Sequence, residues 1–166
     1  MSTPSDVRGH IREPTVFTRP TELENQVTRL FHAPRDRVYK IFTDPATFRD
    51  AFATDPALVT VEKYDFRQGG EFAIVLREKD GTSMRFWGEY REIVPGRRVV
   101  FTVNFREWPG VAWVQTEEYA DVGTFTRLTV RFKFDSREHR DMVPGAEGEN
   151  GTRATWDHVA DLLGSP

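Results

Sequence analysis

The chain has 166 residues, a formal net charge of −3 and no cysteine. This length suits one domain, and the small negative charge argues against a duplex nucleic-acid binder, which usually carries a basic excess. Without cysteine there are no disulfides, thiolate metal sites or cysteine nucleophiles. The sequence begins without the apolar stretch of a secretory signal, and no apolar run approaches the ~20 residues that span a membrane. We therefore expect a cytoplasmic protein without membrane contact.

Residues 1–24 differ in composition from the rest of the chain. Three prolines interrupt a polar stretch in which apolar residues follow no clear period. This pattern predicts a flexible or extended arm ahead of a single domain over residues 25–166. The arm is either disordered or docks on a partner subunit through Val16 and Phe17, which would make the protein a homodimer.

The domain begins with an alternating segment, 25–32, which predicts a strand. Pro34 then favours the start of a helix, because its missing N–H costs nothing in the first helical turn. Apolar residues recur at helical spacing from Val38 onward, and a Thr-Asp-Pro break follows them. A second short helix is expected over residues 46–52.

Strands dominate the middle of the chain, and a helix ends it. The expected strands, separated by Gly- and Pro-containing turns, are 58–66, 71–79, 83–94, 97–106, 112–120 and 125–134. Within residues 152–163, Trp156 and three later apolar residues fall on one helical face. This order predicts an α+β fold in which a curved antiparallel sheet of about six or seven strands wraps around the C-terminal helix, the one large element left to cover it.

Several short motifs also occur in a characteristic order. They are FHAPRDRVY at 31–39, TDP at 43–45, DFRQGGEF at 65–72, FWGEYREIVP at 86–95 and TRLT at 126–129. With these motifs the chain, from about Val27 to Leu163, resembles the SRPBCC superfamily (START-related, birch-pollen-allergen-like), and within it the AHSA-like group (activator of heat-shock-protein ATPase homologue, C-terminal-domain type). It departs from that group in two places. Residues 49–54 lack the usual Trp-containing stretch, and Thr155 stands before Trp156, where the group often has Gly.

The resemblance implies a helix-grip fold with a cavity between the sheet and the C-terminal helix. The expected cavity residues are Phe52, Phe72, Phe86, Gly88, Tyr90, Phe101, Val103, Phe132 and Trp156, with Gly88 allowing the helix to approach closely. These side chains either fill a closed core or surround a pocket for a ligand. We expect a protein that binds an apolar or aromatic small molecule and needs no cofactor.

Two other functions stay open at this stage. One is an enzyme of the polyketide cyclase or hydratase type, for which Glu117, Tyr90 and Tyr119 are weak acid–base candidates. Glu117 serves such a role only if its strand turns that face toward the cavity, where burial would raise the pKa of the carboxyl. The other is a chaperone-associated or partner-binding module without a ligand. The four histidines are isolated in the sequence, so we expect no metal site.

Overall fold

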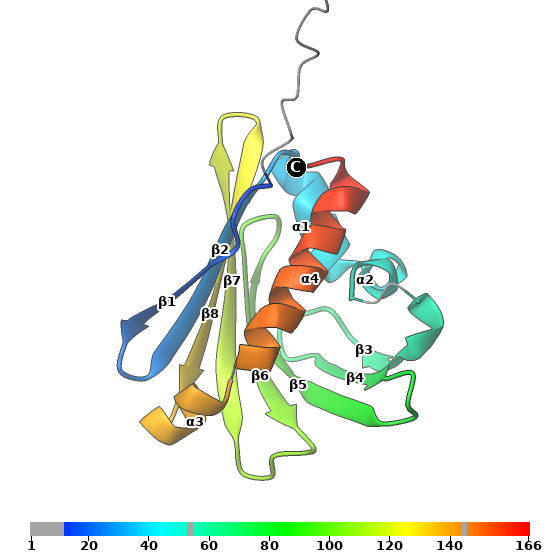
Figure 1. Ribbon diagram of the computed structural model, residues 1–166, viewed down its shortest axis with the longest axis vertical. Helices are drawn as coiled ribbons and strands as arrows, with labels where there is room; N and C mark the ends of the chain where they lie inside the picture. Colours follow the sequence, from blue (N-terminus) through cyan, green and yellow to red (C-terminus); the bar gives the residue numbers. More distant parts are fainter. Residues whose placement is uncertain (1–11, 53–54, 144–145) are drawn as a thin grey trace, which may run out of the picture.

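An eight-stranded antiparallel sheet forms the body of the protein in the computed structural model, which describes residues 12–52, 55–143 and 146–166. The strands are β1 (Val16–Thr21), β2 (Glu24–Phe31), β3 (Val59–Tyr64), β4 (Glu71–Arg77), β5 (Ser83–Val94), β6 (Arg98–Phe105), β7 (Ala112–Val122) and β8 (Phe125–Phe134). Their spatial order is β1-β2-β8-β7-β6-β5-β4-β3. The sheet curves strongly, so that β3 and β4 lie far from the plane of β1 and β2 (Figure 1).

The two faces of the sheet follow from the alternation of apolar and polar residues. In β8, Thr126, Leu128 and Val130 are buried, whereas Arg127 between them is exposed. Successive strand residues point to opposite faces, so this alternation gives a concave apolar face and a convex polar one. The register keeps the pattern across the sheet, because Val130 pairs with Glu117 of β7 on the concave side.

A long C-terminal helix, α4 (Ala146–Leu163), lies across the concave face (Figure 1). Trp156, Val159 and Ala160 are buried and pack in one apolar cluster with Phe31 of β2. This agrees with the predicted fold class. The helix begins six residues before the predicted 152, and Gly148 and Gly151 lie inside it despite their low helix propensity.

Two short helices, α1 (Arg35–Thr43) and α2 (Pro45–Phe52), follow β2 as the sequence predicts. Asp44 separates them, and its side chain accepts a hydrogen bond from the backbone N–H of Ala46 at 2.9 Å. A 3-10 turn, η1 (Pro56–Leu58), leads into β3, and a single-turn helix, α3 (Arg137–Met142), follows β8. Within the described ranges, no helix has the length and apolar character to cross a membrane.

Part of the expected N-terminal arm belongs to the sheet. Residues 1–11 lie outside the described residues, but β1 pairs with β2 and raises the strand count to eight, above the six or seven expected. The aromatic ring of Phe17 lies 4.5 Å from the guanidinium carbon of Arg153 in α4. In this structure Phe17 therefore contacts its own chain.

Candidate functional site

A cavity of about 300 Å³ lies between the concave face and α4. Its lining combines Phe48, Phe52, Phe66, Phe72, Phe86, Phe101, Phe132, Tyr64, Tyr90, Trp113 and Trp156 with aliphatic residues such as Val103 and a few polar ones. This volume is at the lower end of the range for small-molecule sites, which are also mainly apolar. Of the nine residues expected around the cavity from the sequence, eight line it, and Gly88 does not.

The aromatic wall is ordered by edge-to-face contacts. Tyr90 of β5 lies between Phe66 and Phe72, with ring centroids 5.0 Å and 5.4 Å away. Phe72 in turn meets Phe101 of β6 at 5.5 Å and a perpendicular angle. Such tilted and perpendicular pairs avoid face-to-face repulsion between ring quadrupoles. The wall is therefore a packed aromatic surface with its shape set before any ligand binds.

Four inward side chains of β7 form the polar part of the site. The indole N–H of Trp113 donates to Oε1 of Gln115 at 3.2 Å. Nε2 of Gln115 then donates to Oε1 of Glu117 at 3.3 Å, and the hydroxyl of Tyr119 donates to Oε2 at 2.9 Å. Gln115 and Glu117 line the cavity, so one carboxyl group stands in a mainly apolar wall.

Burial changes the acid–base properties of this carboxyl. Glu117 is only 9% exposed. Desolvation disfavours its charged form and raises its pKa to about 7, although the hydrogen bonds from Tyr119 and Gln115 oppose the shift. Burial likewise raises the pKa of Tyr119 well above its usual value and that of Tyr64 to about 12. At neutral pH the tyrosines are hydroxyl donors, while Glu117 is close to its titration midpoint.

Gly88 allows a close approach, but of a different element from the one expected. A Cβ at this position would lie 1.7 Å from the carbonyl oxygen of Thr102 and 3.0 Å from the ring of Phe72. The element that comes close is therefore β6, and not α4. The backbone N–H of Glu89 bonds to the side chain of Thr102 at 3.0 Å, which marks the same close approach of the two strands.

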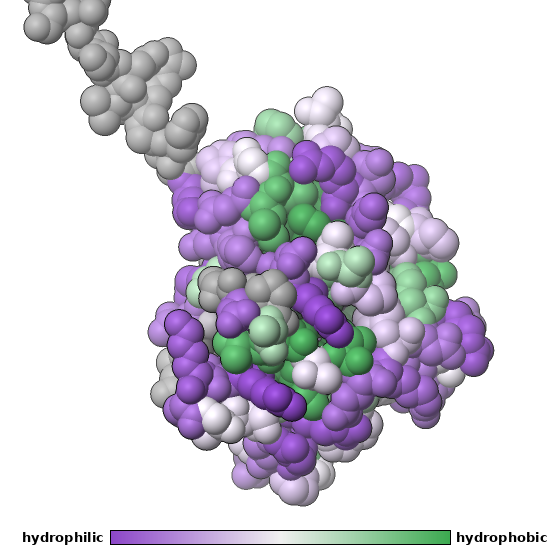
Figure 2. Space-filling model, turned by 90° about the vertical axis from the view of Figure 1, so that its right-hand side faces the viewer, coloured by the Kyte–Doolittle hydropathy of each residue, from purple (hydrophilic) through white to green (hydrophobic). Residues whose placement is uncertain are grey.

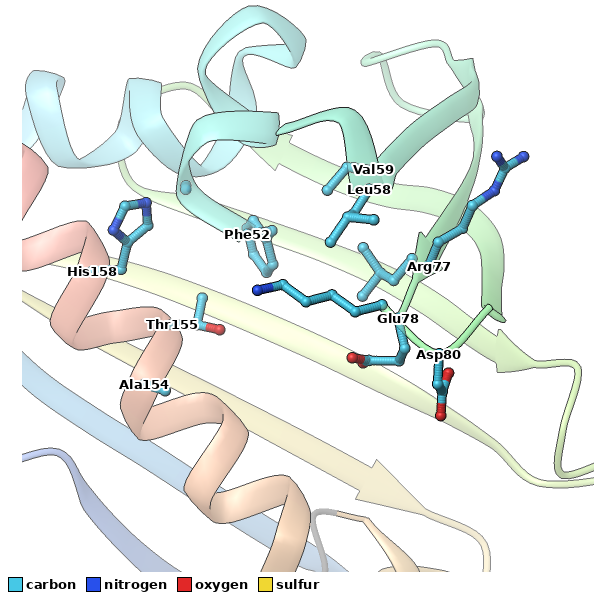
Figure 3. Close-up of a pocket in the computed structure, with 12 residues that line it drawn as sticks. Phe52, Leu58, Val59, Arg77, Glu78, Asp80, Ala154, Thr155 and His158 are labelled. Atoms are coloured by element: carbon cyan, nitrogen blue, oxygen red, sulfur yellow. The ribbon is translucent and has the colours of Figure 1, made fainter. Parts of the chain in front are cut away.

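A second, open cleft of about 620 Å³ adjoins the cavity. Phe52, Leu58 and Val59 border one side of it, Ala154, Thr155 and His158 of α4 face them, and Arg77, Glu78 and Asp80 stand at the far end (Figure 3). Phe52 and Leu76 line both spaces, so they separate the cleft from the cavity. On this side of the molecule, apolar surface is visible between hydrophilic side chains (Figure 2).

Some lining residues were not foreseen from the sequence. Tyr64 ends β3, Phe66 lies in the turn that follows, and Phe48 belongs to α2. For Tyr64 and Phe66, the available sequence signal was the pair of aromatics shortly before Gly69 and Gly70, in a segment expected to be a strand that ends in a tight turn. Among the described residues, no group of three or more His, Asp or Glu side chains is placed to hold a metal ion.

The fold has many counterparts among solved structures. A crystal structure of a protein from Rhodobacter sphaeroides matches with a TM-score of 0.79 and 16% identity, covering 91% of this chain and 98% of that one. A solution structure from Arthrobacter aurescens gives 0.78 and 24%, over 91% and 92% of the chains. A crystal structure from Rhizobium loti gives 0.68 and 28%, over 90% and 99%. No curated protein matches the sequence.

The family is shown by the sequence itself. Residues 32–165 match the family described as Activator of Hsp90 ATPase homolog 1-like protein. The match runs from the residue that follows β2 through the sheet, the cavity and α4, so it includes every element that lines the candidate site except β2. Apart from Phe31, the motifs found in the sequence fall in the same range. The chain therefore belongs to the Activator of Hsp90 ATPase homolog 1-like family, with the helix-grip fold that its structure displays.

Proposed function

We propose that the protein binds an apolar or aromatic small molecule in the cavity between the sheet and α4, and that it does so in the cytoplasm. The observation that carries the proposal is the aromatic wall around a space of about 300 Å³. A ligand in this space leaves water and contacts the aromatic rings. The apolar area that it buries contributes roughly 25 cal/mol per Å² to the binding free energy. Gln115 and Glu117 supply polar groups that fix its orientation.

The adjoining cleft supports a route for such a ligand. Among the residues that the structure describes, Phe52 and Leu76 alone line both the cleft and the cavity. Phe52 stacks on Phe48 with ring centroids 4.1 Å apart, both on the short helix α2. We expect a change of rotamer at either shared side chain to join the two spaces, because both side chains are apolar and packing contacts alone hold them in place.

The first test is native mass spectrometry of gently purified protein, followed by calorimetric titration with naphthylmethanol, a neutral aromatic probe. We expect a discrete extra mass or, for the bare protein, saturable binding of the probe. The spectrum also measures whether the chain forms the proposed homodimer. A bare mass together with no binding of the probe would contradict the proposed function.

A matched pair of variants locates the binding. Val103 of β6 lines the cavity, whereas Val100 lies on the opposite face of the same strand. Val103→Phe fills part of the cavity and should weaken probe binding at least tenfold, while Val100→Phe should leave it unchanged. Unfolding curves of both variants check that each is folded. Equal affinities in the two folded variants would place the ligand elsewhere.

A second candidate function is acid–base catalysis. The hydroxyl of Tyr119 lies 2.9 Å from Glu117, whose pKa of about 7 suits proton transfer at neutral pH. In that case a bound, polarised ligand would exchange a proton with Glu117, as in a cyclase or hydratase. This function also requires the cavity to bind an apolar molecule, so the titration above comes first.

A further inference from the structure

The carboxyl of Glu117 is held as a hydrogen-bond acceptor. Both of its described protein partners are donors, the amide nitrogen of Gln115 on one oxygen and the hydroxyl of Tyr119 on the other. The amide cannot turn around without loss, because the indole N–H of Trp113, which can only donate, bonds to its oxygen. Each carboxylate oxygen still has a free lone pair, so the site offers acceptors to whatever fills the cavity.

No cation of the described ranges balances this carboxyl. Among the ion pairs formed by the described residues, none includes Glu117. Within the same described part of the chain, the cavity lining has no Arg, Lys or His, and Glu117 is its one charged residue. A buried carboxylate without a positively charged partner is disfavoured, even when it accepts hydrogen bonds. Burial accordingly raises the pKa of Glu117, and no nearby cation lowers it again among the described residues.

The aromatic wall acts in the same direction as the carboxyl. The face of an aromatic ring is the negative part of its quadrupole, and it attracts a cation within about 6 Å of its centre. Tyr90, Phe72 and Phe101 are mutually tilted and line the space together. The cavity is therefore mainly apolar, with one acidic group and with aromatic rings whose faces can attract a cation.

We propose that the ligand of this cavity is a protonated amine on an aromatic or other apolar body, with the ammonium group bound by Glu117. The inference rests on the proposed function and specifies its ligand class. The ammonium group supplies the positive charge and the N–H donors that Glu117 lacks, while the body of the ligand is buried against the rings. A neutral ligand of the same size would bury the same apolar surface but would bring no positive charge to Glu117.

The proposal implies a particular pH dependence. An aliphatic amine stays protonated well above neutrality, as lysine does, so Glu117 is the group that titrates near pH 7. The titratable groups that face it are Tyr39 from α1, Tyr64 from β3, Tyr90 from β5 and Tyr119 from β7, and the pKa of each is raised, away from this range. Affinity for an amine should therefore rise about tenfold from about pH 6 to about pH 8.

The experiment compares naphthylmethylamine with naphthylmethanol, which have nearly the same size and shape. Both are titrated calorimetrically into the wild-type chain, the Glu117→Gln variant and the Glu118→Gln variant. Glu118 is the matched control, because it lies on the opposite face of β7 and pairs with Arg98 and Arg131. The quantity measured is the ratio of amine affinity to alcohol affinity, at about pH 6 and about pH 8.

We expect the amine to bind at least tenfold more tightly than the alcohol at the higher pH. This preference and its pH dependence should disappear in Glu117→Gln and persist in Glu118→Gln. Equal binding of both compounds to the wild-type chain would leave the proposed function standing and overturn the amine inference, as would a preference that Glu117→Gln does not change. Binding of neither compound would overturn both.

Discussion

Glu117 makes the stability of the folded chain depend on pH. Its pKa is about 7 in the folded protein, against 4.5 for an ordinary glutamate. The folded state therefore holds a proton that the unfolded state releases between these two values. Below pH 4.5 this group does not lower the free energy of unfolding. As the pH rises from 4.5 to about 7, the free energy of unfolding falls, and above about 7 the loss is complete. The total is about 3 kcal/mol.

Replacement of Glu117 by Gln should remove this pH dependence. The amide keeps the size of the side chain and can accept from Tyr119, but it does not ionise in this range. Relative to the variant, the wild-type chain should lose about 2–3 kcal/mol between about pH 5 and about pH 8, as measured by urea unfolding. Other carboxyl groups are the same in both proteins and cancel in the comparison. Parallel stability curves would contradict the burial of an ionisable group at this position.

At the scale of single elements, the backbones of β5 and β6 approach each other at Gly88 too closely to leave room for a Cβ. A Cβ there would overlap the carbonyl of Thr102, which belongs to the backbone and cannot move aside independently. Gly151 shows the opposite situation, because it lies within α4 and a Cβ there meets nothing within 4 Å. Packing therefore requires glycine at position 88 but not at position 151.

Alanine at each position should change stability in opposite directions. Gly88→Ala should destabilise the fold by more than about 2 kcal/mol, because β5 and β6 must separate locally. Gly151→Ala should stabilise it by about 0.5–1 kcal/mol, since alanine has the higher helix propensity. Thermal and urea unfolding of both variants measure the effects. A tolerated alanine at 88 would mean that the two strands adjust their spacing freely.

Alternation and motif order were enough to predict the sheet, the terminal helix and part of the cavity wall. In β6, for example, Val99, Phe101 and Val103 recur at every second position and all line the cavity. Hairpin turns such as Asp80-Gly81 marked where one strand gives way to the next, to within about two residues, and alternation within each strand then indicated which side chains share a face. These are local properties, and the sequence displays them directly.

The remaining features depend on contacts between distant segments. β1 is a strand because β2 offers it an edge, although its own sequence has no clear period. The crowding at Gly88 comes from Thr102, a residue of another strand. Strand alternation places the four hydrogen-bonded side chains of β7, from Trp113 to Tyr119, on one face. Whether that face points toward the cavity depends on the curvature of the whole sheet. Local patterns carry none of this information.

At the scale of the whole molecule, one buried arginine joins the two ends of the described chain. The side chain of Arg29 in β2 is fully buried and pairs with Asp157 of α4 at 2.6 Å. It also donates to the hydroxyl of Thr15 at 3.1 Å and to the carbonyl of Pro166 at 3.4 Å. The N-terminal segment beside β1 and the C-terminus of the chain lie together at the same end of the sheet (Figure 1).

Loss of the Asp157 carboxylate should weaken this connection. Asp157→Asn leaves the buried charge of Arg29 without its counter-charge, and because Asp157 is itself 42% exposed we expect a loss of about 2 kcal/mol. Asp161→Asn is the matched control on the same helix, since its described partner is the exposed Arg12, and it should change stability by less than about 0.5 kcal/mol. Denaturant unfolding compares the two. Equal effects would show that burial of Arg29 does not depend on Asp157.

The placement of the four tryptophans gives the protein a built-in optical reporter. Trp113 and Trp156 line the cavity, whereas Trp87 lies under Arg85 on β5 and Trp108 packs on Phe105. A chain in which Trp87 and Trp108 are replaced by Phe would emit from the cavity alone. Its fluorescence would then register the arrival of a guest, the water that the guest displaces and the rate at which it leaves, without any attached dye.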